Sequence, residues 1–233
     1  MKNSLIILSG GTGSRMKSDI PKQYIEVYGK PVISYTLNSF DFFLFENIVI
    51  VVADFWKDYV MKICRNDFPN NYFTYAPAGA SRQESILNGL KVLKGKAVND
   101  DIVIIHDAAR PYCSNELVEK LLSACNTANG AMPVLPVKDT VYLSNDGSEI
   151  SSLLDRDKLF CGQAPEAFKY GRYLEINEKL SSEDLAKVRG SSEIAFRNGM
   201  KIALVEGDEA NFKITTPADL ERFIEIQKRR IVE

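Results

Sequence analysis

The sequence has few residues of the kinds that bind transition metals or form disulfides. Histidine occurs once, at His106, and the four cysteines include no C-x-x-C pair. These ligands are too few and too widely spaced to indicate a zinc site. Disulfides are not expected either, because no feature of the sequence suggests secretion. The first apolar run, residues 5–8, is too short for a signal peptide or a membrane span. We therefore expect a reduced cytoplasmic protein without a membrane partner.

The chain also lacks a surplus of positive charge. Its 29 Lys and Arg residues face 31 Asp and Glu residues, which gives a formal net charge of -2. Long-range attraction to nucleic acid is therefore not expected. An anionic ligand must instead be held by a local cluster of cations and backbone N–H groups. The 233 residues, 45% of them hydrophobic, suit a single globular domain that spans residues 1–233.

Five apolar runs predict strands that are buried on both faces. They cover residues 5–8, 48–53, 102–105, 131–137 and 201–205. Helical patterns lie between or after them, at residues 32–40, 56–64, 82–93, 115–125 and 217–228. Strands that alternate with helices predict an α/β fold with a Rossmann-like, doubly wound, mostly parallel sheet. Because ligands of such sheets bind at the carboxyl ends of the strands, we expect the chemistry in the loops after residues 8, 105 and 137.

Residues 138–165 follow a different pattern. Short apolar runs there flank an Asn-Asp-Gly turn at residues 145–147, which predicts a β-hairpin. A hairpin that projects from an α/β core commonly serves as a dimer arm or a lid. We therefore expect a projecting β-hairpin arm at about residues 138–165.

A glycine-rich segment directly follows the first predicted strand. Gly10, Gly11 and Gly13 let the backbone approach a phosphate and aim several N–H groups at it. Arg15 adds a planar cation to the same loop, and Lys22 follows within ten residues. The loop matches neither the P-loop pattern nor the dinucleotide-binding pattern. Its position predicts a phosphate site, with a tight turn that binds nothing as the alternative.

This loop and the Pro-Lys-Gln at residues 21–23 together resemble the sugar-phosphate nucleotidyltransferase superfamily. More narrowly, they are similar to the cytidylyltransferases that act on 2-C-methyl-D-erythritol 4-phosphate or on ribitol 5-phosphate. Five further segments match that family in its own order: 78–85 (AGASRQES), 105–111 (IHDAARP), 136–140 (PVKDT), 156–165 (RDKLFCGQAP) and 211–215 (NFKIT). The matches extend from residue 9 to residue 219, and their combination is highly specific.

The resemblance implies an enzyme that transfers CMP from CTP to a small polyol phosphate and releases pyrophosphate, with Mg²⁺ as cofactor. The acceptor phosphate attacks the α-phosphorus of CTP and is already largely ionised at pH 7, so no general base is required. Catalysis then depends on positioning and on neutralising negative charge. The family's residues at the positions of Arg15 and Lys22 contact the triphosphate, and Lys213 matches a residue at the reacting phosphate. His106 is therefore interpreted as structural.

The resemblance also assigns the nucleotide site. The backbone of the three loop glycines, Gly10, Gly11 and Gly13, is expected to cradle the phosphates. Gly79, Ala80 and Ser85 match the positions that recognise cytosine and ribose in the family. Arg82 is expected to shape the turn formed by this segment, residues 78–85.

The acceptor site is assigned in the same way. Asp107 is expected to hold Mg²⁺ or a substrate hydroxyl, with a cap on the following turn as the alternative, and Arg110 to face the acceptor or tie down its loop. Thr140 and Arg156 match positions at the acceptor phosphate. Arg156 lies in the arm, and in the family this arm crosses to the partner subunit. The resemblance thus implies a homodimer in which Arg156 completes the neighbouring site.

One feature of the family is missing. A Thr/Ser-Asp pair that touches the acceptor hydroxyls in the family falls here on Arg189 and Gly190, so its aspartate is absent. Ser191, Ser192 and Glu193 follow directly and are the candidates to substitute for it.

Two short motifs bear on the acceptor. The sequences SGGTG at residues 9–13 and GQAP at residues 162–165 look more like the ribitol-phosphate group. We therefore predict that the acceptor is a polyol phosphate and the product a CDP-polyol for a cell-surface polymer. The alternative acceptor is 2-C-methyl-D-erythritol 4-phosphate, a precursor of isoprenoids.

Two competing hypotheses are uridylyl or guanylyl transfer and a non-catalytic nucleotide-binding module. The complete set of phosphate-facing cations argues against a non-catalytic module.

Overall fold

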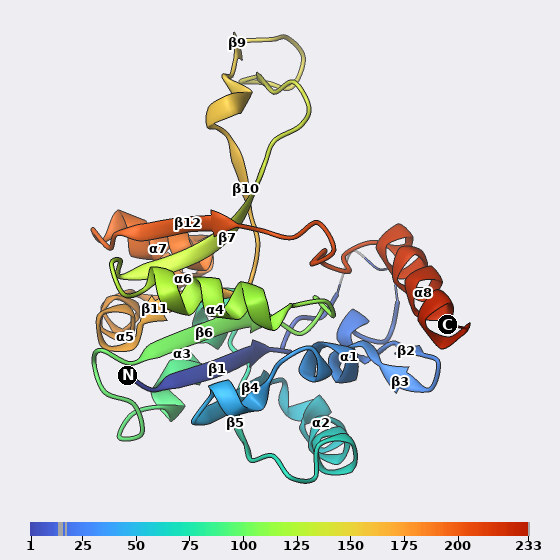
Figure 1. Ribbon diagram of the computed structural model, residues 1–233. Coiled ribbons are helices and arrows are strands. Elements are labelled where there is room, and N and C mark those ends of the chain that lie inside the picture. The colour runs from blue at the N-terminus through green and yellow to red at the C-terminus, as the bar shows by residue number, and fades with distance from the viewer. Residues whose placement is uncertain (14–15, 17, 233) are drawn as a thin grey trace.

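The computed structural model describes residues 1–13, 16 and 18–232. Eight strands in the described chain form one sheet, in the order β10-β7-β11-β6-β1-β4-β5 with β12 paired to β7 (Figure 1). They are β1 (Asn3–Leu8), β4 (Asn47–Val52), β5 (Phe73–Pro77), β6 (Ile102–Asp107), β7 (Gly130–Pro136), β10 (Phe160–Gly162), β11 (Glu166–Lys169) and β12 (Ile202–Glu206). Only β10 and β11 run antiparallel to their neighbours, so the predicted mostly parallel sheet is confirmed.

Helices cover both faces of this sheet, as predicted for a doubly wound fold. One face packs against α1 (Val32–Asn38), α2 (Asp54–Asp67) and α4 (Asn115–Ala124). The other packs against α3 (Arg82–Val92), α5 (Tyr170–Glu178), α6 (Ser182–Lys187) and α7 (Ser191–Arg197). Leu5 and Ile7 point into the first layer and Ile6 into the second, and all three are fully buried. Burial of each such side chain contributes about 1.5–3 kcal/mol, which explains why apolar runs without alternation form these strands.

The sequence did not predict three strands of the sheet, which are β5, β10 and β11. β5 is half-buried at the sheet edge, and β11 has Glu166 and Lys169 at its ends. Neither forms a continuous apolar run, so the pattern that reveals a doubly buried strand is absent from both. β6 also continues two residues beyond the predicted 102–105, because His106 and Asp107 still pair with β1.

The strand order reverses between β1 and β6. From β1 the chain passes through α1 to β4 on one side of β1, whereas β6 lies on its other side. Leu8 at the end of β1 therefore lies beside Asp107 at the end of β6. Open α/β sheets bind their ligands in the crevice at such a switch point.

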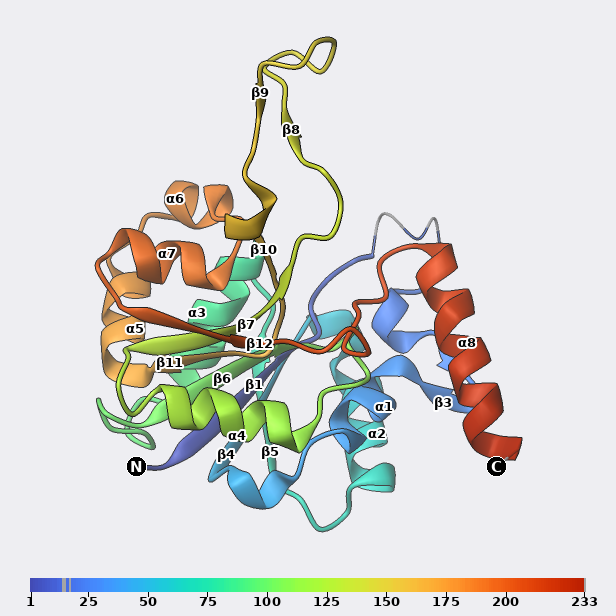
Figure 2. The same cartoon turned by 45° about the horizontal axis from the view of Figure 1, so that its top comes forward.

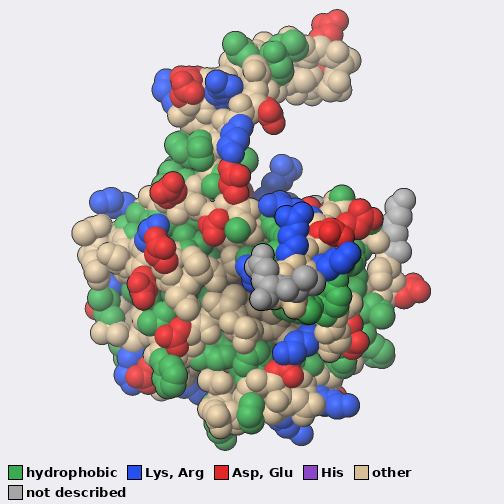
Figure 3. Space-filling view, turned by 45° about the vertical axis from the view of Figure 1, so that its right-hand side comes forward, with side chains coloured by type: hydrophobic (Ala, Val, Ile, Leu, Met, Phe, Trp, Pro, Cys, Tyr) green, Lys and Arg blue, Asp and Glu red, His purple; other side chains and the backbone are tan. Residues whose placement is uncertain are grey.

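The segment after β7 forms the predicted arm. Its two short strands, β8 (Tyr142–Leu143) and β9 (Ser152–Leu153), are antiparallel and stand clear of the sheet (Figures 1 and 2). The turn η4 (Arg156–Lys158) leads back to β10. The space-filling view shows the arm projecting from the body with hydrophobic and charged side chains on its surface (Figure 3).

Four of the remaining elements pack beside the first strand's loop. They are η2 (Lys22–Tyr24), β2 (Glu26–Val27), β3 (Lys30–Pro31) and α8 (Pro217–Val232). The turn η3 (Phe42–Leu44) lies at the start of β1 instead, where Asn3 Nδ2 donates to the carbonyl of Leu44 at 3.1 Å. Phe223 of α8 is fully buried against Val27, Val32 and Ile214. Among the described residues, no helix is long and apolar enough to cross a membrane.

His106 is completely buried in β6. Its Nε2–H donates to the carbonyl of Arg110 at 3.0 Å, and its ring packs edge-on against Phe40. Burial lowers the pKa of the imidazole to about 4, so the side chain is neutral at pH 7. This environment agrees with the structural interpretation of His106.

We predict that His106 makes the fold sensitive to mild acid. Its pKa is about 6.5 in an unfolded chain and about 4 in the folded protein. Its contribution to stability is therefore fully present above pH 6.5 and is lost as the pH falls towards 4, at up to about 1.4 kcal/mol per pH unit. Urea unfolding between pH 6.5 and pH 5 should show this slope, and His106→Gln should flatten it. Equal slopes in the two proteins would contradict the assignment.

Candidate active site

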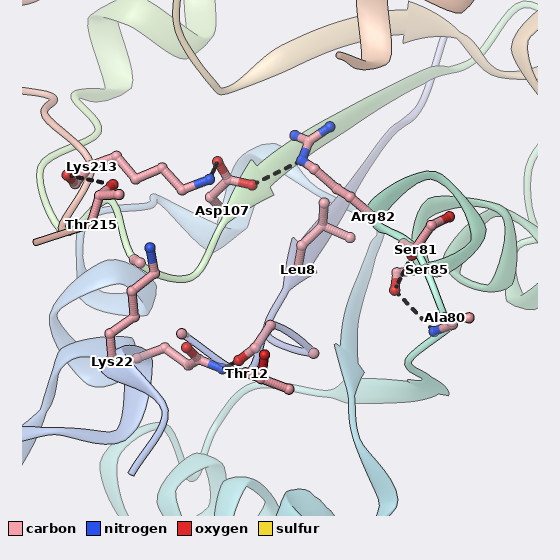
Figure 4. Close-up of a pocket in the computed structure, with 16 residues that line it drawn as sticks. Leu8, Thr12, Lys22, Ala80, Ser81, Arg82, Ser85, Asp107, Lys213 and Thr215 are labelled. Atoms are coloured by element: carbon pink, nitrogen blue, oxygen red, sulfur yellow. Dashed lines mark hydrogen bonds and ion pairs between the residues drawn. The ribbon is translucent and has the colours of Figure 1, made fainter. Parts of the chain in front are cut away.

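A cavity of about 350 Å³ opens at the switch point between β1 and β6. Five segments line it: the glycine loop after β1, the turn η2, the turn that begins α3, the end of β6 and the loop before α8 (Figure 4). The predicted loops after residues 8 and 105 thus meet here. The loop after residue 137 leads into the arm and supplies none of the described lining residues, so chemistry in that loop stays a prediction.

The glycine loop is fixed from the side of η2. Gln23 Nε2 donates to the carbonyls of Ser9 at 2.9 Å and Gly11 at 2.8 Å, and Tyr24 Oη donates to Ser9 at 2.8 Å. A Cβ at Gly10 would lie 2.4 Å from the Cβ of Ala78, so only glycine fits there. The carbonyl oxygens of Ser9 and Gly11 therefore accept hydrogen bonds within the protein and do not face a bound anion.

Lys22 follows this loop and lines the cavity while only 9% exposed. Gly13, with φ of +72°, brings the loop back against the backbone of Lys22. Figure 4 shows the Lys22 side chain reaching into the same space as Lys213 and Asp107. Arg15, the other cation predicted for the triphosphate, lies outside the described residues.

The turn before α3 is held by its own side chains. Ser85 Oγ accepts from the N–H of Gly79 at 2.9 Å and donates to the carbonyl of Ser81 at 3.0 Å. Glu84 accepts from the N–H of Ala80 at 2.8 Å. Gly79, Ala80 and Ser85 all line the cavity, as the resemblance implied, and their N–H groups and hydroxyl are satisfied within the turn.

Asp107 is the centre of the charges in the cavity. Its Oδ1 accepts from Arg82 Nε at 3.3 Å, its Oδ2 from Lys213 Nζ at 2.8 Å, and Arg110 Nε lies 3.8 Å from Oδ2. Burial acts to raise the pKa of Asp107, but Arg82 and Lys213 hold that pKa well below its usual range. The carboxylate is therefore ionised at neutral pH.

Arg82 plays a different part from the one implied. Its side chain leaves the turn of α3 and crosses to Asp107, Ser191 and Glu166. Burial acts to lower the pKa of Arg82, but Asp107 and Glu166 raise it beyond its ordinary value. Arg82 thus joins the end of β6 to β11 and the start of α7, whereas Ser85 and Glu84 shape the turn.

Arg110 fits the second of its two predicted roles. Its Nη1 donates to the carbonyl of Asn211 at 2.7 Å, and it is not among the described residues that line the cavity. Burial lowers the pKa of its guanidinium. Asn211 Nδ2 in turn donates to the carbonyl of Ala164 at 2.7 Å. Arg110 therefore ties down the loop that carries Lys213.

Thr140 and Arg156 lie in the arm, away from this cavity. The Arg156 side chain is 54% exposed and donates to the carbonyl of Lys138 at 3.0 Å. A single chain therefore brings Lys22, Lys213 and Asp107 together but leaves the two arm residues outside the site.

A metal site built by the protein alone is not found in the described part of the chain. No group of three His, Cys, Asp or Glu residues there could hold an ion. Asp107 is the only carboxylate among the described lining residues. This arrangement fits an ion that is held mainly by the phosphates of a bound nucleotide, since Mg²⁺ usually takes only one or two protein carboxylates at such sites.

Three residues that build the site have roles that the sequence did not predict. Gln23 holds the glycine loop through its side-chain amide. The signal in the sequence that could have identified this role is an amide residue in the Pro-Lys-Gln motif close to the glycine loop. Thr215 lines the cavity, and Asp219 holds it by accepting from its N–H at 2.9 Å. Glu166 has no local signal, because its partners Arg82 and Ser192 are distant in the sequence.

Comparison with known proteins shows the family of this chain. The model of the family IspD, 2-C-methyl-D-erythritol 4-phosphate cytidylyltransferase, matches residues 4–227. A protein of that name from Clostridium botulinum is 34% identical over 94% of both chains. A ribitol-5-phosphate cytidylyltransferase from Streptococcus agalactiae is 31% identical over 96% of this chain and 94% of its own.

Solved structures show the same likeness. The 4-diphosphocytidyl-2C-methyl-D-erythritol synthase of Anaerococcus prevotii superposes with a TM-score of 0.83 at 27% identity, covering 97% of this chain and 98% of its own. The 2-C-methyl-D-erythritol 4-phosphate cytidylyltransferase of Francisella tularensis gives 0.77 at 29% identity, over 96% and 98%. With the family match over nearly the whole length, these findings show that the chain belongs to the IspD family of cytidylyltransferases.

Proposed function

We propose that this enzyme transfers CMP from CTP to the phosphate of a polyol phosphate. An acceptor phosphate oxygen bonds to the α-phosphorus of CTP, the bond from that phosphorus to the bridging oxygen breaks, and pyrophosphate leaves. The observation that carries the proposal is the meeting of Lys22, Lys213 and Asp107 with the glycine loop in one cavity. That cavity offers fixed cations and close backbone approach, which a reaction between phosphates needs.

The reaction needs no general base. The second pKa of a phosphate monoester is about 6, so the acceptor is already largely ionised at pH 7. Lys22 and Lys213 are therefore proposed to neutralise charge that develops on the reacting phosphate, together with Arg15. His106 is buried and is not among the described residues that line the cavity. This position agrees with a mechanism that has no general base.

The nucleotide is proposed to lie between the glycine loop and the turn before α3. Gly10, Gly11 and Gly13 would cradle its phosphates with their N–H groups. The N–H groups of Gly79 and Ala80 are satisfied within the turn. The backbone groups with which this turn would contact a base are therefore its carbonyl oxygens. Cytosine presents an amino donor that such acceptors can bind.

Mg²⁺ is the proposed cofactor. Bound with the nucleotide, it would supply additional positive charge to the phosphates. Asp107 is the residue proposed to hold it, because Asp107 is the only carboxylate among the described lining residues. The same carboxylate orients Lys213 through their 2.8 Å hydrogen bond.

Ribitol 5-phosphate or a related polyol phosphate is the proposed acceptor. The support is the pair of motifs at residues 9–13 and 162–165, which resemble the ribitol-phosphate group. The product would be a CDP-polyol made in the cytoplasm for a cell-surface polymer. The second candidate acceptor is 2-C-methyl-D-erythritol 4-phosphate, which the names of the matching family and of the Clostridium relative favour.

A homodimer formed through the arm is also proposed. Tyr142, Leu143, Ile150 and Leu153 on the arm are 46–67% exposed. Its ladder pairs only two residues of each strand, which is too little for a hairpin that is stable by itself. A partner subunit that covers these side chains would stabilise the arm and receive Arg156.

We predict that one polyol phosphate will stand out in an assay of pyrophosphate release with CTP and Mg²⁺. The panel holds ribitol 5-phosphate, 2-C-methyl-D-erythritol 4-phosphate and other short-chain sugar and polyol phosphates, with UTP and GTP as control nucleotides. Ribitol 5-phosphate or a close relative should give the largest kcat/KM. A preference for 2-C-methyl-D-erythritol 4-phosphate would support the second candidate, and preference for UTP or GTP would overturn cytidylyl transfer.

Lys22→Ala should lower turnover by about 10³-fold or more, because a fixed charge that acts on the transition state is lost. The melting temperature should change little. Lys30→Ala, which removes an exposed lysine of the neighbouring β3, is the matched control. Near-normal turnover in Lys22→Ala would remove this residue from the mechanism.

Co-expression of two inactive variants should restore activity. If Arg156 completes the partner's site, a heterodimer of Arg156→Ala and Lys22→Ala chains has one intact site and one doubly defective site. We expect about half the wild-type turnover in heterodimers isolated with two different tags, and little in either homodimer. Heterodimers as inactive as the homodimers would show that Arg156 acts within its own chain, and an Arg156→Ala homodimer with near-normal turnover would show that Arg156 has no part in the site.

A further inference from the structure

Glu166 is a buried carboxylate outside the cavity. It lies at the start of β11 and is only 6% exposed. Its Oε1 accepts from the backbone N–H of Ser192 at 3.0 Å and from the Ser192 hydroxyl at 2.7 Å. Its Oε2 lies 3.5 Å from Arg82 Nη2. The carboxylate therefore connects the start of α7 to an arginine that lines the active site.

Arg82 in turn has a partner at every nitrogen of its guanidinium. Nε donates to Asp107, Nη1 to the hydroxyl of Ser191, and Nη2 faces Glu166. A guanidinium with a partner at each of its three nitrogens is held in one orientation. Its charge serves to connect other groups rather than to bind the triphosphate.

The result is a row of alternating charges across the site. Lys213 bonds to Asp107, Asp107 to Arg82, and Arg82 to Glu166. The row draws on four separate elements: the loop before α8, the end of β6, the start of α3 and β11. In a buried row of this kind, loss of an end charge leaves its neighbour uncompensated and changes the geometry of the remainder.

The start of α7 has no carboxylate of its own at residues 189 and 190, which are Arg189 and Gly190. The next two residues, Ser191 and Ser192, are 0% and 8% exposed and bond to Arg82 and Glu166. Glu193 in the first turn of α7 accepts from the N–H of Arg189 and pairs with Arg197. The carboxylate that faces Arg82 and Ser192 at this corner therefore comes from another element, β11.

We infer that Glu166 is a positioning residue that fixes the start of α7 and, through Arg82 and Asp107, the reacting-phosphate lysine Lys213. The inference rests on the proposed transfer to an acceptor phosphate and assigns Glu166 to the acceptor side of that site. The glycine loop and the turn at Gly79, which face the nucleotide, make their hydrogen bonds through Gln23, Tyr24 and Ser85 instead. Loss of Glu166 should therefore impair use of the acceptor more than binding of CTP.

The test is Glu166→Gln, which keeps an oxygen for Ser192 but removes the charge that faces Arg82. We expect kcat/KM for the acceptor to fall by about 10–100-fold, the range seen when supporting partners of site residues are removed. The KM for CTP should stay within about twofold. Glu175→Gln is the matched control, because Glu175 pairs with Arg172 and Lys179 on the surface of α5. It should behave like the wild type.

Ser192→Ala guards against a variant that fails to fold. It removes only the hydroxyl contact at 2.7 Å and should raise the acceptor KM in the same direction by less. Combined with Glu166→Gln, its effect should be smaller than the sum of the two, because both changes act on one contact. Unchanged acceptor kinetics in both single variants, or equal losses for CTP and acceptor, would overturn the inference.

Hydrogen exchange of the free enzyme separates this inference from the proposed function. Glu166→Gln should speed exchange at the backbone amide of Ser192 and its neighbours in α7, and Glu175→Gln should not. If the wild type uses no acceptor in the panel, the proposed function fails, whereas the exchange result still decides whether Glu166 fixes α7. Unchanged exchange in Glu166→Gln would refute the positioning role whatever the acceptor.

Discussion

The site depends on one buried carboxylate. Asp107 lies at the end of β6, where the sheet's strand order reverses, and it draws Arg82, Lys213 and Arg110 towards it from three separate segments. Removing one partner of a buried ion pair costs about 3–5 kcal/mol, because the other charge is left uncompensated. The four groups therefore hold one another in place, and the cavity is shaped before any ligand enters. The glycine loop is fixed separately, by hydrogen bonds from Gln23 of η2, the turn that also carries Lys22.

The sequence predicted the parts of this protein that depend on local pattern. Apolar runs identified five strands because a doubly buried strand needs apolar residues on both faces. The glycine loop was found because it follows the first predicted strand, whereas Lys22, Asp107 and Lys213 were assigned through motifs that resemble the family's. The cavity contains all of these that the structure describes.

The parts that were missed depend on contacts between distant residues. Arg82 reaches Ser191 across 109 positions of sequence, and Glu166 reaches Ser192 across 26. Nothing near Arg82 in the chain shows that its side chain leaves the turn it begins. β11 escaped prediction because a four-residue strand that starts with Glu166 has no apolar run. Its glutamate is tolerated in the core only because Ser192 and Arg82 compensate it.

The positive charges of the cavity are too few to balance both substrates. The described lining holds three cationic side chains, Lys22, Arg82 and Lys213, and one carboxylate, Asp107. The triphosphate of CTP carries about four negative charges at pH 7, and the acceptor phosphate adds about two. Of the three cations, Arg82 is already balanced by Asp107 and Glu166. The remaining positive charge must therefore come with the ligand or from outside the cavity, and Mg²⁺, Arg15 and Arg156 of the partner subunit are the proposed sources. The described lining thus carries three cations against one carboxylate before any ligand enters, and the proposed Mg²⁺ is the cation that would arrive with the nucleotide.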